Sequence, residues 1–145
     1  MPTSTTYSIL SDLEEVSRLS QTIHKMVADA GMGEVDSARV ELGVVEALNN
    51  VIEHAYQLQA NHEIKVIFEP SKNYVVIHII DTGITMQHSL FSAEDNLPEV
   101  KEHLELVDIP EGGWGLALIK SIMDEVSYKS ENGINHLTLL KKMNG

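Results

Sequence analysis

Several residue types are scarce in this chain of 145 residues, and each scarcity excludes a class of protein. There is no cysteine, so disulfide frameworks and thiolate metal sites are impossible. Lysine and arginine together number 10 against 22 acidic residues, which gives a formal net charge of −12. Binding to a nucleic-acid backbone needs a basic face that displaces counterions, so we do not expect this chain to bind DNA or RNA directly.

Long hydrophobic runs are also missing. No apolar segment approaches the roughly 20 residues that a membrane-spanning helix needs, and residues 1–6 do not combine a basic region with an apolar one. We therefore expect a cytoplasmic protein with no membrane contact. The length and the apolar content of 43% suit one domain that covers residues 1–145.

The N-terminal half alternates between short extended and helical patterns. Residues 6–10 predict a first strand, and Ser11 to Glu14 form a capping-box pattern before a helix that ends at Gly31. A second helix is predicted from about Glu34 to Leu58. Its expected apolar stripe consists of Val35, Ala38, Leu42, Val45, Leu48, Ile52 and Ala55.

The C-terminal half predicts mainly strands. Alternation and β-branching indicate antiparallel strands over residues 64–69 and 74–80, and a closing hairpin over 126–129 and 136–140 around Asn132-Gly133. A helix is expected over residues 115–124. Residues 84–112 predict a long connection, typical of a lid, with a short helix near 99–106. The predicted fold is an α+β two-layer sandwich, with a mixed or mostly antiparallel sheet and helices on one face.

Glu46 and Asn50 lie four residues apart in the second predicted helix, so both side chains project into one space. An amide oxygen can complete the shell of a magnesium ion whose other ligands are phosphate oxygens and water. A neighbouring carboxylate can accept the proton of an attacking hydroxyl group. The alternative is that both residues are ordinary solvated side chains of an amphipathic helix.

Asp81 ends an apolar strand, where its carboxylate can accept a hydrogen bond from the exocyclic amine of adenine. Gly83 would let the backbone pass close to a flat base. The alternative is a plain turn, because Asp-x-Gly after a strand is common turn chemistry.

A third motif, Gly112-Gly113-Trp114-Gly115-Leu116, opens the predicted third helix. Free amide groups and the positive end of the helix dipole make such a helix start an anion site, which suits phosphate. A flexible hinge followed by a helix cap is the alternative interpretation.

In this order, Glu46-x-x-x-Asn50, Asp81-x-Gly83 and Gly113-x-Gly115-Leu116 resemble the three nucleotide-binding boxes of the ATPase fold shared by histidine kinases, type II topoisomerases and Hsp90 chaperones. Within that group, residues 111–119 followed by Met123 to Val126 are similar to the small bacterial anti-sigma factors that are serine/threonine kinases. The resemblance runs from about residue 6 to residue 142.

The resemblance implies a Bergerat-type (GHKL) site for ATP and Mg²⁺. In such a site Asn50 holds the magnesium and Glu46 is the catalytic base. Asp81 and Gly83 contact adenine, while Gly113 and Gly115, at the start of the helix that continues with Leu116, contact the phosphates. A threonine near adenine is expected late in the last strand. Thr138 is the candidate for it, with Leu140 as the alternative if the alignment slips.

The resemblance also implies partners. Such proteins bind a sigma factor and phosphorylate a serine or threonine of its anti-anti-sigma antagonist, commonly as homodimers. The apolar first helix and first strand offer surfaces for dimerisation. A non-catalytic module that binds ATP and only sequesters its partner is the main alternative, and the intact Glu46 favours the kinase. A histidine-kinase catalytic domain is a third interpretation, which the expected lack of an upstream phosphoacceptor hairpin disfavours.

Overall fold

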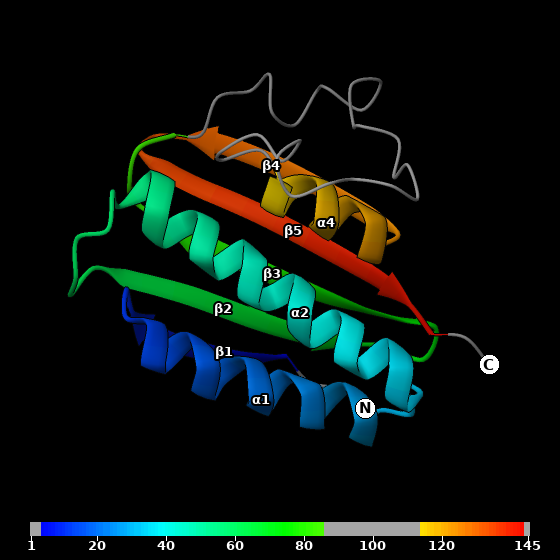
Figure 1. Ribbon diagram of the computed structural model, residues 1–145. Coiled ribbons are helices and arrows are strands. Elements are labelled where there is room, and N and C mark those ends of the chain that lie inside the picture. Colours follow the sequence, from blue (N-terminus) through cyan, green and yellow to red (C-terminus); the bar gives the residue numbers. More distant parts are fainter. Residues whose placement is uncertain (1–3, 86–113, 144–145) are drawn as a thin grey trace.

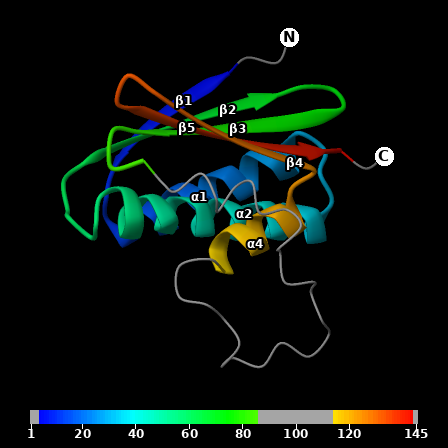
Figure 2. The ribbon, with the colours of Figure 1, turned by 90° about the horizontal axis from the view of Figure 1, so that it is seen from above.

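The computed structural model describes residues 4–85 and 114–143. In this part of the chain one five-stranded sheet carries helices on one of its faces, which Figure 2 shows edge-on. The elements follow one another as β1 (Thr5–Leu10), α1 (Leu13–Asp29), α2 (Glu34–Asn50), η1 (Val51–Ala55), β2 (Glu63–Pro70), β3 (Tyr74–Asp81), α4 (Trp114–Ile122), β4 (Glu125–Glu131) and β5 (Ile134–Lys142) (Figure 1).

The strand order is β1-β2-β3-β5-β4, and every neighbouring pair is antiparallel. Alternate residues of each inner strand are buried under the helices, as Ile77 and Ile79 of β3 are opposite Leu139 and Leu137 of β5. The same register places Asp81 directly opposite Asn135. The α+β fold with helices on one face is therefore as predicted from the sequence.

The first helix begins one residue later than the predicted capping box implies. Asp12, not Ser11, is the N-cap of α1, and its side chain accepts a hydrogen bond from the backbone N–H of Glu14. The hydroxyl of Ser11 instead donates to the carbonyl of Gln59 and accepts from the backbone N–H of His62. Ser11 thereby joins the start of α1 to the loop before β2.

The second helix differs from its prediction in two ways. Its regular α-helical part ends at Asn50, and a single π-helical turn, η1, follows from Val51 to Ala55. The predicted apolar stripe is also wrong in part, because Val35 and Leu42 are exposed. The helix is instead buried on a broad face that meets the sheet, α1 and α4, formed by Ser37, Val40, Gly43, Val44, Ala47, Leu48 and Asn50.

The closing hairpin forms at the predicted turn. Asn132 and Gly133 both have positive φ, 54° and 77°, as a two-residue turn that matches the twist of the strands requires. The predicted lid over residues 84–112, apart from residues 84 and 85, and its short helix near 99–106 lie outside the described residues. None of the helices in the described ranges is long and apolar enough to cross a membrane.

Candidate functional site

Glu46 and Asn50 occupy the last turn of α2, immediately before the π-helical turn η1. Asn50 is only 6% exposed, whereas Glu46 is partly exposed. Single π-helical turns occur frequently at functional sites, because they shift the helix register by one residue. The sequence predicted the spacing of this pair, but it did not predict the change of helix type that directly follows Asn50.

Two consecutive residues of this turn each have a buried polar atom without a partner among the described residues. Asn49 Oδ1 and Asn50 Nδ2 have no hydrogen-bond partner in the described part of the chain. A buried polar group without a partner costs about 1–3 kcal/mol, so a native structure keeps such groups where a ligand or water completes them. The free N–H donor of Asn50 therefore fits an acceptor such as a phosphate oxygen or water, whereas a cation at this residue would be held by its amide oxygen.

A magnesium ion is also compatible with the few oxygen ligands that the protein offers around Asn50. Within residues 4–85 and 114–143, no three histidine or acidic side chains converge into a metal site of their own. Mg²⁺ usually takes only one or two protein oxygens and completes its octahedron with phosphate oxygens and water. A metal ion held at Asn50 would accordingly need a nucleotide to supply further ligands.

Asp81 closes β3 and points toward the helical side of the sheet. It is 3% exposed, and its Oδ1 accepts hydrogen bonds from the backbone N–H of Gly83 at 2.9 Å and from Nδ2 of Asn135 at 2.8 Å. Burial raises the pKa of Asp81 above its ordinary value, and the hydrogen bonds from Asn135 and Gly83 act in the opposite direction. The carboxyl group is thus held in a defined orientation at the edge of the core.

Asn135 is a site residue that sequence reasoning missed. It is 1% exposed, and besides Asp81 its side chain bonds to the carbonyl of Gly83 and the hydroxyls of Thr85 and Ser130. The predicted last strand began at His136, which left Asn135 in the turn. The alternation of Leu137 and Leu139 could have revealed it, since the next inward position toward the turn is residue 135.

Gly83 allows a close backbone approach to η1, while its expected contact with adenine stays a prediction. A Cβ at this position would collide with the backbone carbonyl of Ala55 in η1. The N–H of Ile84 bonds to the same carbonyl at 2.8 Å, and the N–H of Thr82 donates to the hydroxyl of Tyr56 at 3.0 Å. The glycine therefore fastens the Asp81 segment to the π-helical turn that follows Asn50.

The described part of the third motif, Trp114 to Leu116 at the start of α4, lies toward the C-terminal end of α2, because α4 runs antiparallel to α2 (Figure 1). A Cβ on Gly43 would lie 2.8 Å from Cε of Met123 and 3.7 Å from Cγ2 of Ile122. Asn50 lies seven residues after Gly43 in α2, and Gly115 lies seven residues before Ile122 in α4. The start of α4 is therefore level with Asn50.

Gly113 lies outside the described residues, so its predicted role is untested. Leu116 is 3% exposed and belongs to the hydrophobic core, so its side chain anchors α4 and only its backbone could meet a phosphate.

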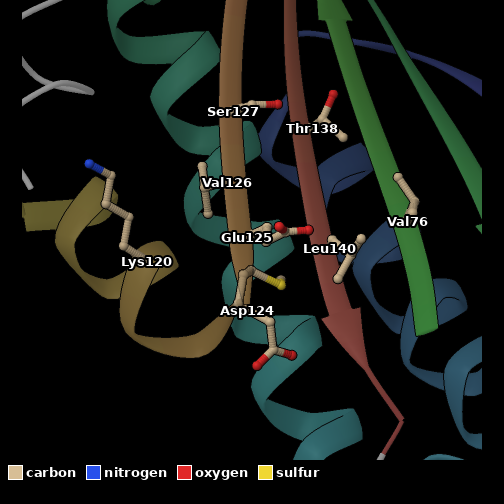
Figure 3. Close-up of a pocket in the computed structure, with 9 residues that line it drawn as sticks. Val76, Lys120, Asp124, Glu125, Val126, Ser127, Thr138 and Leu140 are labelled. Atoms are coloured by element: carbon tan, nitrogen blue, oxygen red, sulfur yellow. The ribbon is translucent and has the colours of Figure 1, made fainter. Parts of the chain in front are cut away.

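Thr138 lies on the face of the sheet that the helices do not cover, opposite to Asp81, because β5 buries residues 135, 137, 139 and 141. It lines a pocket of about 620 Å³ beside Val76, Ser127 and Leu140 (Figure 3). Leu140 shares that face, so the alternative alignment fails for the same reason. Both residues therefore lie outside the candidate site.

The sequence motifs and the fold now agree on one class of domain. A family model described as the histidine kinase-like ATPase domain matches residues 9–141. The chain belongs to this family. Among relatives of this ATPase-domain protein is a serine-protein kinase, RsbW of Staphylococcus aureus, which is 30% identical over 122 residues. That alignment covers 83% of this chain and 76% of the relative.

Solved structures share the fold of this histidine kinase-like ATPase domain. The RsbU and RsbW domains of Rv1364c from Mycobacterium tuberculosis match with a TM-score of 0.66 at 16% identity, over 97% of this chain and 32% of that one. The chain thus spans about a third of that protein's solved chain. The Acinetobacter baumannii histidine kinase AdeS matches with a TM-score of 0.54 at 16% identity, over 96% of this chain and 68% of that one.

Proposed function

We propose that this chain is an anti-sigma factor with serine/threonine kinase activity. It sequesters a sigma factor, and with Mg-ATP it phosphorylates the anti-anti-sigma antagonist of that factor. The observation that carries the proposal is the last turn of α2, where the buried amide of Asn50 has an unpartnered Nδ2 one turn from the carboxylate of Glu46. Support also comes from the S. aureus relative, which is named a serine-protein kinase.

In this proposal each part of the site has one role. Asn50 holds the magnesium ion through its Oδ1, which leaves Nδ2 to donate to a phosphate oxygen or water; the ion when bound neutralises charge on the phosphates. The carboxylate of Asp81 accepts a hydrogen bond from the exocyclic amine of adenine, and Gly83 keeps the Asp81 segment close to η1. The start of α4, with Gly115 and the backbone of Leu116, meets the phosphates through its free N–H groups and the positive end of its dipole.

Glu46 is the proposed general base. The hydroxyl oxygen of a serine or threonine on the antagonist forms a bond to the γ-phosphorus, while the bond from that phosphorus to the β,γ-bridging oxygen breaks and ADP leaves. The proton of the hydroxyl passes to the carboxylate of Glu46. The partly exposed position of Glu46 suits this role, because the hydroxyl arrives on another protein.

The proposed partners are a sigma factor, a STAS-type antagonist and a second copy of this chain. The net charge of −12 complements the basic surfaces that proteins of transcription present, and it disfavours direct contact with DNA. A cytoplasmic location follows from such partners and is part of the proposal.

The proposal is tested by incubating the protein with ATP labelled at the γ-phosphate and a candidate antagonist encoded nearby. We expect label on a serine or threonine of the antagonist. Glu46→Gln should keep ATP binding, measured by calorimetry, but lower phosphate transfer by at least about a hundredfold, as expected for loss of a general base. Glu34→Gln removes the same charge at the exposed start of the same helix and should transfer phosphate at the parental rate.

The alternatives give different results in the same assay. A protein that binds ATP and sigma factor but leaves the antagonist unlabelled is the non-catalytic sequestering module. Label on a histidine would indicate a histidine-kinase domain. A parent protein that shows no heat of ATP binding has no nucleotide site, and the whole proposal fails.

A further inference from the structure

The side chain of Asn135 bonds at both of its ends. Its Nδ2 donates to Asp81 Oδ1 at 2.8 Å and to the carbonyl of Gly83 at 3.0 Å, while its Oδ1 accepts from Ser130 Oγ at 2.7 Å and from Thr85 Oγ1 at 3.1 Å. The reverse orientation of the amide would place its oxygen against a carboxylate and a carbonyl oxygen. The donor end of Asn135 must therefore face Asp81.

The two oxygens of Asp81 consequently differ. Oδ1 accepts two hydrogen bonds, one from Asn135 and one from the backbone of Gly83, which matches its two lone pairs. Oδ2 accepts no hydrogen bond from any residue of the described part of the chain. Asp81 therefore offers a ligand one free acceptor oxygen rather than a fork of two.

A single acceptor oxygen on Asp81 suits adenine better than guanine. The edge of adenine that carries its exocyclic amine presents one donor group next to an acceptor nitrogen. The corresponding edge of guanine presents two adjacent donors, N1–H and the N2 amine, which a carboxylate satisfies best with both oxygens. A site that leaves a buried donor unpaired rejects the ligand that carries that donor.

We propose that Asn135 is a specificity-determining residue of the nucleotide site: together with the backbone N–H of Gly83 it fills both lone pairs of Asp81 Oδ1, which restricts the carboxylate to one acceptor and thereby favours adenine over guanine. This inference rests on the function proposed above and adds a residue that contacts the base only through Asp81. The hydrogen bond from Asn135 also opposes the rise that burial causes in the pKa of Asp81, which favours the acceptor form of the carboxylate.

The test compares nucleotide preference in the full chain. Asn135→Leu removes the donor to Asp81 while keeping a side chain of similar size. With Mg-ATP and Mg-GTP as ligands in calorimetry, we expect the ratio of Kd for GTP to Kd for ATP to fall about tenfold, the scale of a bidentate base contact. Ser130→Ala is the matched control, because it removes a hydrogen bond to Asn135 but leaves the bond to Asp81 in place.

Inosine triphosphate separates this role from general loosening of the pocket. Inosine has the N1–H donor of guanine but lacks the N2 amine, so a second free acceptor should improve GTP binding in the Leu variant and leave binding of inosine triphosphate nearly unchanged. Equal gains for both nucleotides, or an unchanged ratio, overturn the inference. Asn135→Ala gives the same comparison if the Leu variant does not fold. Absence of ATP binding by the parent protein refutes the proposed function instead.

Discussion

At the residue scale, Asp81 shows a conflict between burial and hydrogen bonding within one carboxyl group. The side chain is almost fully enclosed, and this desolvation disfavours its charged form and raises its pKa. The hydrogen bonds from Asn135 and the backbone of Gly83 recover part of that cost. A residue kept at a cost to folding is expected where binding needs it.

Asp81→Asn should accordingly remove one contribution to the dependence of stability on pH. Because the folded-state pKa is raised, the folded parent binds more protons than the unfolded chain between the ordinary pKa of 3.8 and the raised value, so its stability falls as pH rises through that window. The Asn variant lacks this term. Its stability relative to the parent, measured by urea unfolding from pH 4 to pH 8, should therefore increase with pH and then level off.

The exposed Asp29→Asn variant serves as the control for loss of one negative charge. A stability difference between parent and Asp81→Asn that stays flat across this pH range, or declines with rising pH, would contradict the assigned direction of the pKa shift. Weaker ATP binding by Asp81→Asn together with unimpaired folding would mark the carboxylate as functional rather than structural.

At the element scale, the site depends on how α2, η1 and α4 pack together. The end of the Met123 side chain lies against Gly43 of α2, and Gly83 lets the segment after β3 approach η1. Lys141, a buried lysine on β5, donates its ammonium group to the carbonyl of Ile122 and so caps the C-terminus of α4. The contacts of Met123 and Ile122 hold the C-terminal end of α4 against α2 and β5.

Gly43→Val should therefore weaken both folding and nucleotide binding. The added methyl groups would meet Met123 and Ile122, and overpacking of this kind costs typically 1–3 kcal/mol. Ala38→Val, at an exposed position of the same helix, introduces the same residue without that contact. We expect Gly43→Val to be about 2 kcal/mol less stable than the Ala38 variant in urea unfolding.

Nucleotide affinity gives a second measurement on these two variants. Displacement of α4 should raise the Kd for ATP in Gly43→Val and leave it unchanged in Ala38→Val. Valine has a higher helix propensity than glycine, so propensity alone would make Gly43→Val more stable than the parent, and a loss of stability must come from packing. Equal stability of the two variants would show that α4 tolerates the displacement.

At the scale of the whole molecule, the net charge of −12 opposes an anionic ligand. ATP carries several negative charges, so metal-free ATP meets repulsion that Mg-ATP largely avoids. Removing Mg²⁺ with EDTA should therefore weaken ATP binding by at least about tenfold, one order of magnitude in Kd. Added NaCl should partly restore the metal-free affinity, because the screening length falls from about 10 Å at 0.1 M to about 3 Å at 1 M.

Choline chloride at equal concentration separates screening from specific binding of sodium. The two salts should act alike on metal-free ATP, and neither should improve binding of Mg-ATP by a comparable factor. A steady loss of metal-free affinity with rising salt would mean that local positive charge dominates the site despite the acidic surface.

The element order and the fold class were accessible from the sequence, because hydrophobic periodicity depends on local geometry. Alternation in residues 64–69 and 74–80, the helical spacing after Leu13, and the Asn132-Gly133 turn each correspond to an element of the structure. The burial pattern of α2 was less accessible. That helix meets the sheet, α1 and α4 at once, so a single stripe could not describe its buried face.

The composition and motifs of this chain by themselves determined the class of domain and the spacing of Glu46 and Asn50, because residues one helical turn apart are neighbours in any α-helix. Only the tertiary structure decided which distant residues meet. Strand register pairs Asp81 with Asn135 and places Thr138 on the opposite face of the sheet, since a shift of one residue exchanges the two faces of a strand. The contact of Gly83 with Ala55 likewise depends on how the end of β3 meets η1.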